Sequence, residues 1–248
     1  MDSMKKRYLS VFIPAYNAEL QIEKVVKRIP DDLWQSVNRL YIINDGSTDR
    51  TQDKVDMLSS ANKLIVPVKF DRNRGYGSAV KAGVELCKKD GCQYAACVHA
   101  DGQYPPEYIQ RFIECMRKDG YDLIQGSRIA SGTAISGGMP LYKYVAGKWL
   151  TFLENAVFKL KLTDYHSGFL VYSRNVLNRI DFGRLSSSFD FDLEVIASVR
   201  ALDLAIGELP IPTRYADEIS YLNPVTYGLR VLKVLCKYCL GRYKEKNT

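Results

Sequence analysis

Polar and acidic side chains gather in five short segments, each of which directly follows a predicted strand. These segments are Pro14–Glu19, Asn44–Asp49, Asp71–Ser78, His99–Tyr104 and Ser127–Arg128. Open α/β sheets bind their ligands at the carboxyl ends of the strands, where the connecting loops meet. We therefore expect the five segments to converge on one edge of a sheet and to form an active site there.

The segment around Asp101 carries oxygen donors at a spacing that suits a hard metal ion. Asp101 and Gln103 are two residues apart, so in extended backbone both project to the same side. Oxygen ligands suit Mg²⁺ or Mn²⁺, which are commonly shared with substrate phosphates. His99 is a further candidate ligand, although a single histidine beside a core strand is more often only hydrogen-bonded. A turn with incidental acids would explain the short motif equally well.

The segment around Asp45 predicts a turn from a strand into a helix. Gly46 lets the backbone turn, and Ser47 or Thr48 can cap the following helix. Capping leaves Asp45 unexplained, because this residue precedes the turn and lies across the strand tips. A carboxylate there can accept hydrogen bonds from a nucleobase N–H or a ribose hydroxyl.

Hydrophobic periodicity predicts an α/β fold with a mostly parallel sheet, helices on both faces and a single domain. In the first half, strands are expected over residues 8–13, 40–43, 64–70, 94–98 and 122–125, and helices over about 19–28, 48–60, 77–88 and 106–118. The second half predicts helices over 141–162, 190–202 and 225–242, and strands over 166–173 and 205–209. No internal repeat or linker divides the chain.

The composition is that of an ordinary globular protein with a mild basic excess. The 248 residues are 46% hydrophobic and 25% charged, with a formal net charge of +7. This charge suits nucleic acid, an anionic membrane surface or phosphorylated substrates, but the cations are dispersed, which disfavours a nucleic-acid reader. The six cysteines fit reduced thiols. With no apolar leader or membrane-spanning run, a cytoplasmic location is expected.

Four motifs, in this order, resemble the signatures of family 2 glycosyltransferases of the GT-A type. They are Pro14–Asn17 (PAYN), Asn44–Asp49 (NDGSTD), His99–Gln103 (HADGQ) and Gly126–Arg128 (GSR). Within the family, the chain is most similar to polyprenyl-phosphate sugar transferases. The resemblance implies a GT-A catalytic domain over residues 1–224, followed by a C-terminal amphipathic helix and basic tail over residues 225–248.

The resemblance also implies roles for single residues on the donor side. Those expected to hold the nucleotide-sugar are Pro14, Tyr16, Glu19, Asp45, Asp101 and Arg128, with Arg128 on phosphate. Asp101 and Gln103 would bind Mn²⁺ or Mg²⁺ at the diphosphate. Asn44 and His99 stand where the family has acidic residues.

On the acceptor side, the segment Thr163–Phe169 resembles the family's DxxSGFR motif, with Leu170 in place of its arginine. The resemblance places Asp164 near the acceptor as the candidate catalytic residue, although a helix-terminal acid is an equally good reading. Lys143 and Arg214 are candidate contacts for the acceptor phosphate. A sugar hydroxyl would need Asp164 as its base, whereas a phosphate dianion would not.

These observations predict an inverting transfer of a sugar from a UDP- or GDP-sugar to a polyprenyl phosphate. The alternatives are transfer to a glycan hydroxyl in polysaccharide synthesis and a non-catalytic nucleotide-sugar-binding protein. In the C-terminal helix, cations share one side and apolar residues another: Arg230, Lys233 and Lys237, against Leu229, Leu232, Cys236 and Leu240. Such a helix either lies on a membrane or packs on the domain. A peripheral location at the inner face of the membrane, in cell-envelope synthesis, is therefore expected.

Overall fold

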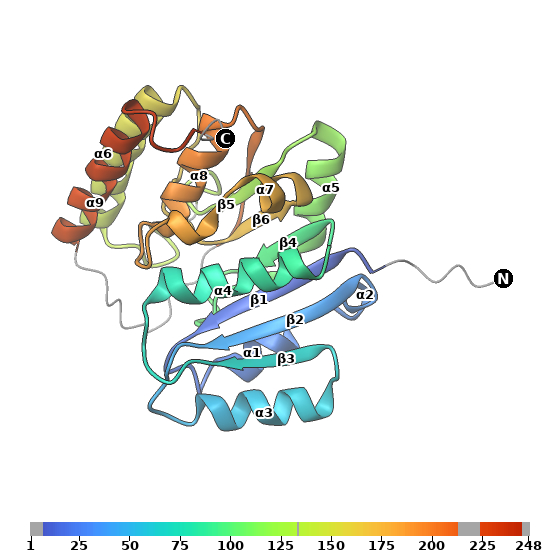
Figure 1. Ribbon diagram of the computed structural model, residues 1–248. Coiled ribbons are helices and arrows are strands. Elements are labelled where there is room, and N and C mark those ends of the chain that lie inside the picture. The colour runs from blue at the N-terminus through green and yellow to red at the C-terminus, as the bar shows by residue number, and fades with distance from the viewer. Residues whose placement is uncertain (1–6, 133, 213–223, 245–248) are drawn as a thin grey trace.

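The computed structural model describes residues 7–132, 134–212 and 224–244, and its centre is one twisted sheet (Figure 1). In this part of the chain the sheet has seven strands in the order β3-β2-β1-β4-β6-β5-β7. The strands are β1 Leu9–Ala15, β2 Val37–Asn44, β3 Ile65–Lys69, β4 Tyr94–Cys97, β5 Leu123–Ser127, β6 Leu170–Ser173 and β7 Ile206–Pro210. Only β6 runs antiparallel to its neighbours β4 and β5. The predicted α/β fold with a mostly parallel sheet is confirmed.

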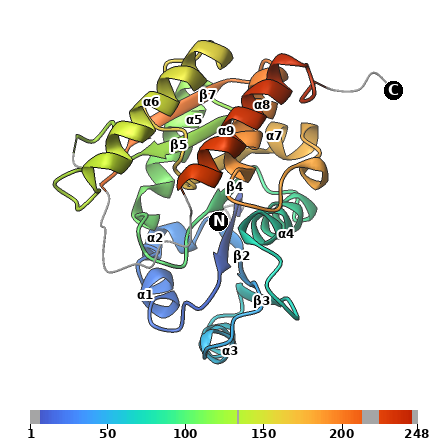
Figure 2. The same cartoon turned by 90° about the vertical axis from the view of Figure 1, so that its left-hand side faces the viewer.

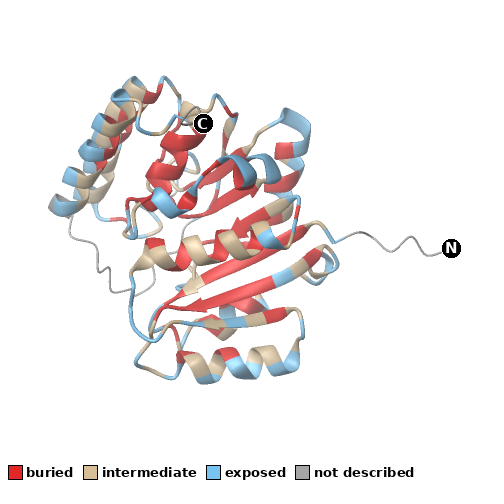
Figure 3. Ribbon diagram, viewed as in Figure 1, coloured by how far each residue is buried: buried red, intermediate tan, exposed pale blue. Residues whose placement is uncertain are grey.

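Helices cover both faces of this sheet (Figures 1 and 2). They are α1 Ile22–Lys27, α2 Asp31–Trp34, α3 Thr51–Ala61, α4 Tyr76–Lys89, α5 Ile109–Asp119, α6 Leu141–Phe158, α7 Arg174–Arg179, α8 Phe191–Ala201 and α9 Pro224–Cys239, with short 3₁₀ turns at Pro106–Tyr108 and Phe182–Arg184. Because strand side chains alternate, Phe12 enters the core beneath α4 and α8, while Val11 and Ile13 enter the core beneath α1 and α5. The two buried layers share the sheet, as Figure 3 shows.

The loops that follow β1 and β2 are joined by side-chain caps. The backbone N–H of Asn17 donates to Oγ of Ser47 at 3.0 Å, and that of Ala18 donates to Oγ1 of Thr51 at 2.7 Å. Gly46 has a positive φ of 66°, and a Cβ atom there would lie 2.2 Å from the backbone carbon of Arg72. Only glycine therefore lets the loop after β3 lie on the loop after β2.

The second half of the chain departs most from expectation. The strand predicted over 166–173 is ordered as β6 only from Leu170, and the residues before it form an irregular segment. Its backbone N–H groups are taken by side chains: those of Thr163 and Asp164 donate to the Glu208 carboxylate, and that of Gly168 donates to the Tyr104 hydroxyl. Long-range side-chain hydrogen bonds thus hold the segment that leads into β6.

The C-terminal helix α9 packs on α6 and α8. Its buried side chains are Val231, Val234 and Leu235, which are not the apolar residues that the sequence placed on one face. Among the helices of the described residues, none has the length and apolar character needed to cross a bilayer.

Candidate active site at the carboxyl edge of the sheet

Asp45 stands at the end of β2 and organises the loop after β3. Its carboxylate is almost fully buried and accepts the backbone N–H groups of Arg74 at 2.7 Å and Gly75 at 3.0 Å. Burial raises the pKa of Asp45, while these two hydrogen bonds and the Arg74 charge oppose the rise. Pro14, expected to begin the loop, instead lies inside β1 and pairs with Ile43 of β2, and the exposed Tyr16 directly follows the strand. The structure therefore brings three predicted donor residues to one edge.

Glu19, the fourth residue predicted for the donor, is tied to the start of α3. Its Oε2 atom accepts the backbone N–H of Arg50 at 2.9 Å, and its own N–H donates to Asp49 at 3.2 Å. These contacts hold the loops after β1 and β2 together. No finding tests a role for Glu19 in donor binding, which stays a prediction.

His99 lies in an aromatic cage behind the site. Its Nε2 atom is 3.1 Å from the Tyr76 hydroxyl, and its ring meets the edge of Tyr104. Burial lowers the pKa of His99, which makes the neutral ring the stable form, and the Asp101 charge opposes this. A Cβ atom on Gly168 would lie 2.4 Å from the imidazole, so glycine is needed there. The contacts favour the hydrogen-bonded interpretation of His99 over a ligand role.

Tyr76 and Asp192 continue this network and were not predicted from the sequence. The Tyr76 hydroxyl donates to Oδ2 of Asp192 at 2.7 Å, deep beneath the strand tips. Burial raises the pKa of Asp192 to about 7, against the opposing Tyr76 hydrogen bond. Asp192 lies in the first turn of α8, so from sequence alone it resembles any acid near the start of a helix.

Asp101 and Gln103 lie on the turn after β4, at the same edge. Asp101 is exposed, and its Oδ1 atom accepts the backbone N–H of Gln103 at 2.9 Å. Among the described residues there is no group of three or more His, Cys, Asp or Glu side chains that could hold a metal. The oxygen donors of Asp101 and Gln103 nevertheless fit a hard divalent ion that takes its other ligands from a diphosphate and water.

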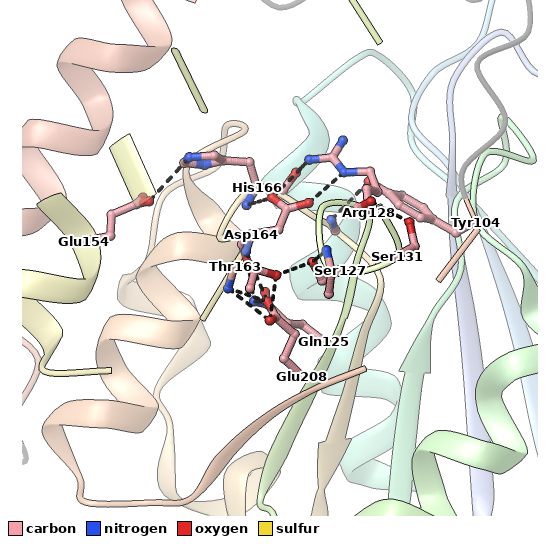
Figure 4. A network of polar contacts seen from close by, with 12 residues as sticks. Tyr104, Gln125, Ser127, Arg128, Ser131, Glu154, Thr163, Asp164, His166 and Glu208 are labelled. Atoms are coloured by element: carbon pink, nitrogen blue, oxygen red, sulfur yellow. Dashed lines mark hydrogen bonds and ion pairs between the residues drawn. The ribbon is translucent and has the colours of Figure 1, made fainter. Parts of the chain in front are cut away.

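Arg128 and Asp164 form a buried ion pair on the other side of β4 (Figure 4). Nε of Arg128 donates to Oδ2 of Asp164 at 2.8 Å, and Nη2 donates to Oδ1 at 3.2 Å. Burial alone would raise the pKa of Asp164, but the charge and hydrogen bonds of Arg128, with help from His166, hold it below its ordinary value. Asp164 is therefore a fully partnered, ionised carboxylate.

The acceptor-side segment rests on a polar platform from β5 and β7. Glu208 accepts the backbone N–H and the hydroxyl of Thr163, and the amide of Gln125 donates to the carbonyl of Asp164. Oγ of Ser127 also lies 2.7 Å from the Thr163 hydroxyl. Sequence analysis did not find this support, because Glu208 reads only as a polar residue of a strand.

Glu154 and His166 form a second buried pair, next to Asp164 (Figure 4). Oε2 of Glu154 lies 3.4 Å from Nε2 of His166, whose Nδ1 is 3.0 Å from the Tyr227 hydroxyl on α9. Burial raises the pKa of Glu154 well above its ordinary value, and the Asp164 charge adds to this. Burial also lowers the pKa of His166 to about 4. Burial thus favours the neutral form of both groups.

The two predicted acceptor-phosphate contacts, Lys143 and Arg214, are both untested. Lys143 lies half-buried in the first turn of α6, and no finding tests its contact with phosphate. Arg214 lies outside the described residues. Both assignments stay predictions.

Several curated proteins are similar to the chain over nearly its whole length. A UDP-N-acetylglucosamine–dolichyl-phosphate N-acetylglucosaminyltransferase of Methanococcus voltae is 26% identical, over 96% of this chain and 99% of the relative. A dolichyl-phosphate hexose transferase of Haloferax volcanii is 28% identical, over 94% of each chain. A dolichol-phosphate mannosyltransferase of Saccharomyces cerevisiae is 27% identical, over 81% of this chain and 75% of the relative.

Among solved structures, glucosyl-3-phosphoglycerate synthase of Mycobacterium tuberculosis, in complex with Mn²⁺, UDP and phosphoglyceric acid, superposes with a TM-score of 0.70. The match covers 94% of this chain and 78% of that one at 17% identity, so it supports the GT-A fold alone. The family model "Glycosyl transferase family 2" matches residues 10–181. Since this match spans well over half of the sequence, the chain belongs to glycosyl transferase family 2.

Proposed function

We propose that this family 2 glycosyltransferase moves one sugar from a nucleotide-sugar, with UDP or GDP as the nucleotide, to a polyprenyl phosphate. Three relatives that match most of the chain carry dolichyl or dolichol phosphate in their names. Membership of the family confirms the predicted enzyme class and disfavours a non-catalytic binding protein. The sugar, the nucleotide and the inverting course of the reaction belong to the proposal.

The proposal of a phosphate acceptor, rather than a hydroxyl, rests on the ionisation state of Asp164. A carboxylate paired with Arg128 at 2.8 Å, with a lowered pKa, is a weak base and has few lone pairs to spare for a hydroxyl proton. A sugar hydroxyl needs such a base. A phosphate monoester does not, because its second pKa is about 6 and it is largely a dianion at neutral pH.

In this reaction Asp164 is a positioning residue that fixes the guanidinium of Arg128 rather than a base. Arg128, held by Asp164 and by the carbonyl of His166 at 2.9 Å, offers a fixed cation to phosphate oxygens. Attack by the acceptor oxygen on the anomeric carbon, with departure of the nucleoside diphosphate, is a single displacement and would invert the configuration.

On the donor side, Asp45, Pro14 and Tyr16 would hold the nucleoside at the edge of β1 and β2. Asp101 and Gln103 would hold Mn²⁺ or Mg²⁺, which when bound would neutralise negative charge on the leaving diphosphate. Asp101 has the accessible carboxylate for this role. The neutral His99 packs behind it and keeps the turn in place.

The test is a transfer assay with purified protein, detergent-solubilised polyprenyl phosphate, Mn²⁺ or Mg²⁺, and a panel of labelled UDP- and GDP-sugars. We expect label in the lipid phase, a rate that rises as the acceptor phosphate ionises near a pH of about 6, and no product from the matched polyprenol. Asp164→Asn should keep this pH profile at reduced rate, whereas the exposed control Asp203→Asn should match wild type. Equal transfer to polyprenol, or to a glycan hydroxyl alone, would overturn the proposal.

A further inference from the structure

Helix α6 has a second apolar side, which is on the outside. Five large apolar side chains of α6 recur with helical spacing on this side, and each is between 58% and 68% exposed: Leu141, Tyr142, Val145, Trp149 and Phe152. The buried side of the same helix carries Thr151 and Glu154 as well as Phe158. Leu150, Leu153 and Val157 also pack against the core from this side. The exposed stripe is therefore additional to the one apolar side that a surface helix normally has. An exposed apolar stripe of this length indicates a partner that is itself apolar.

Helix α9 adds a second exposed stripe beside the first. Leu229, Leu232 and the following Leu240 are exposed, although Val231, Val234 and Leu235 already supply the packed side. Figure 2, in which this side of the molecule faces the viewer, shows α6 and α9 side by side in front. We call the exposed apolar residues of α6, together with these three leucines, the outer apolar face.

The surroundings of the outer apolar face are cationic. Helix α9 contains no Asp or Glu, and the single acid of α6, Glu154, is fully buried. Beside α9 lies a cleft of about 480 Å³ whose lining includes four cations, Arg184, Arg230, Lys233 and Lys237. Arg230 and Lys237 are paired with acids of α8 and its N-terminus. Within the described part of the chain, Lys233 and Arg184 have no acidic partner.

From this combination we infer that the outer apolar face docks on an anionic membrane surface, with the cationic cleft against lipid headgroups. A Trp and a Tyr on the apolar stripe suit the boundary between headgroups and acyl chains, and basic residues beside it suit anionic lipid. A second copy fits less well, because two-fold pairing would bring the same cations together without acids to face them. The inference rests on the proposed lipid-linked acceptor, and names the surface through which the enzyme reaches it.

Binding to vesicles tests the inference without catalysis. The vesicles contain phosphatidylcholine alone, or equal parts phosphatidylcholine and phosphatidylglycerol, with no polyprenyl phosphate and no sugar donor. The full chain should co-float with the mixed vesicles and be released by salt. In Trp34→Phe, which leaves Trp149 as the only tryptophan, fluorescence should shift to the blue and be quenched by brominated acyl chains.

Matched variants distinguish binding through the outer apolar face from non-specific adsorption to vesicles. The double variant Trp149→Ser/Phe152→Ser should lower the partition coefficient at least about tenfold, and Lys233→Glu should lower it about fivefold or more. The controls Met57→Ser and Lys63→Glu change an exposed apolar residue and an exposed cation at α3, at the far end of the molecule, and should bind as wild type does.

Three outcomes would overturn the inference: no vesicle binding by wild type, equal loss in the α3 controls, or a wild-type dimer that Trp149→Ser/Phe152→Ser converts to a monomer while vesicles are ignored. The last would assign the face to a second copy. Transfer to detergent-solubilised acceptor should be unchanged in the face variants. If wild type shows no such transfer either, the proposed function fails. The vesicle-binding assay still tests the outer apolar face independently.

Discussion

The buried Glu154–His166 pair makes a quantitative prediction about stability and pH. Glu154 ionises in the unfolded chain above its ordinary pKa of 4.5 but keeps its proton in the fold, so its contribution to stability falls as pH rises above 4.5. His166 is protonated in the unfolded chain below its ordinary pKa of 6.5 but stays neutral in the fold down to about 4. The contribution of His166 to stability therefore rises with pH between about 4 and 6.5.

In wild type these two slopes oppose each other. Folding in effect moves one proton from the imidazole of His166 to the carboxylate of Glu154, so the total number of protons bound by the two side chains does not change. Single substitutions remove one slope and expose the other. A fully developed slope is about 1.4 kcal/mol per pH unit, and the rounding of both titration curves near their midpoints reduces the change between pH 4.5 and 6.5 to about 2 kcal/mol. Relative to wild type, His166→Asn should lose this amount over the interval, and Glu154→Gln should gain stability over it.

Urea unfolding at pH 4.5, 5.5 and 6.5, followed by circular dichroism, measures these differences. Glu114→Gln, which changes an exposed glutamate on α5, is the control and should give a pH-independent difference from wild type. Because only the change with pH is compared, the constant cost of an altered core does not enter. Slopes of the same sign in the two variants, or no slope in either, would refute the neutral buried pair.

Three further outcomes follow from the site. Arg128→Lys should lower kcat by about 10²-fold or more, since an ammonium cannot make both contacts to Asp164 and still present a fixed cation; steady-state kinetics measure it, and an unchanged kcat would contradict the role. Tyr76→Phe should destabilise the fold by about 1–3 kcal/mol, because Asp192 loses its buried donor; urea unfolding would show it. Gly46→Ala should raise the KM for the donor, because the added Cβ atom would displace the loop after β3 at Arg72. An unaltered KM would argue against a role of that loop in donor binding.

The carboxyl-edge loops were predictable because parallel strands impose their geometry. Once residues 8–13, 40–43 and 94–98 are recognised as neighbouring strands, the loops that carry Asp45 and Asp101 have to meet at one edge. The register of those strands and the convergence of the loops agree with this expectation. Local pattern and one topological rule were sufficient.

The acceptor side was less predictable because its order comes from distant residues. Glu208 lies in β7 yet holds the backbone of Thr163, and Tyr227 lies in α9 yet meets His166. Neither pairing leaves a trace in local periodicity. Glu154 did carry a signal, since it is the only acid in an aromatic helix. That helix is apolar on two sides, however, and its periodicity cannot reveal which of them faces the protein.

Helix α9 shows the same limit. Its sequence is apolar on two sides, with cations along one edge, so dividing it into one apolar and one charged side selected Leu229, Leu232, Cys236 and Leu240. The structure packs the other apolar side instead. Periodicity locates an amphipathic helix, but only tertiary contacts decide which side the core takes.

The orientation of α6 links the two proposals physically. Trp149 and Phe152 face outward on a helix whose inner side presents Glu154 to His166, and the N–H of His166 donates to Asp164 at 2.9 Å. The contacts continue to Arg128 through its ion pair with Asp164, so they connect α6 with the fixed cation of the site. An ionised Glu154 would place a buried negative charge on the inner side of α6, close to that of Asp164. With Glu154 and His166 neutral, Asp164 and Arg128 are a balanced pair of charges between α6, which we propose faces the membrane, and the carboxyl edge of the sheet.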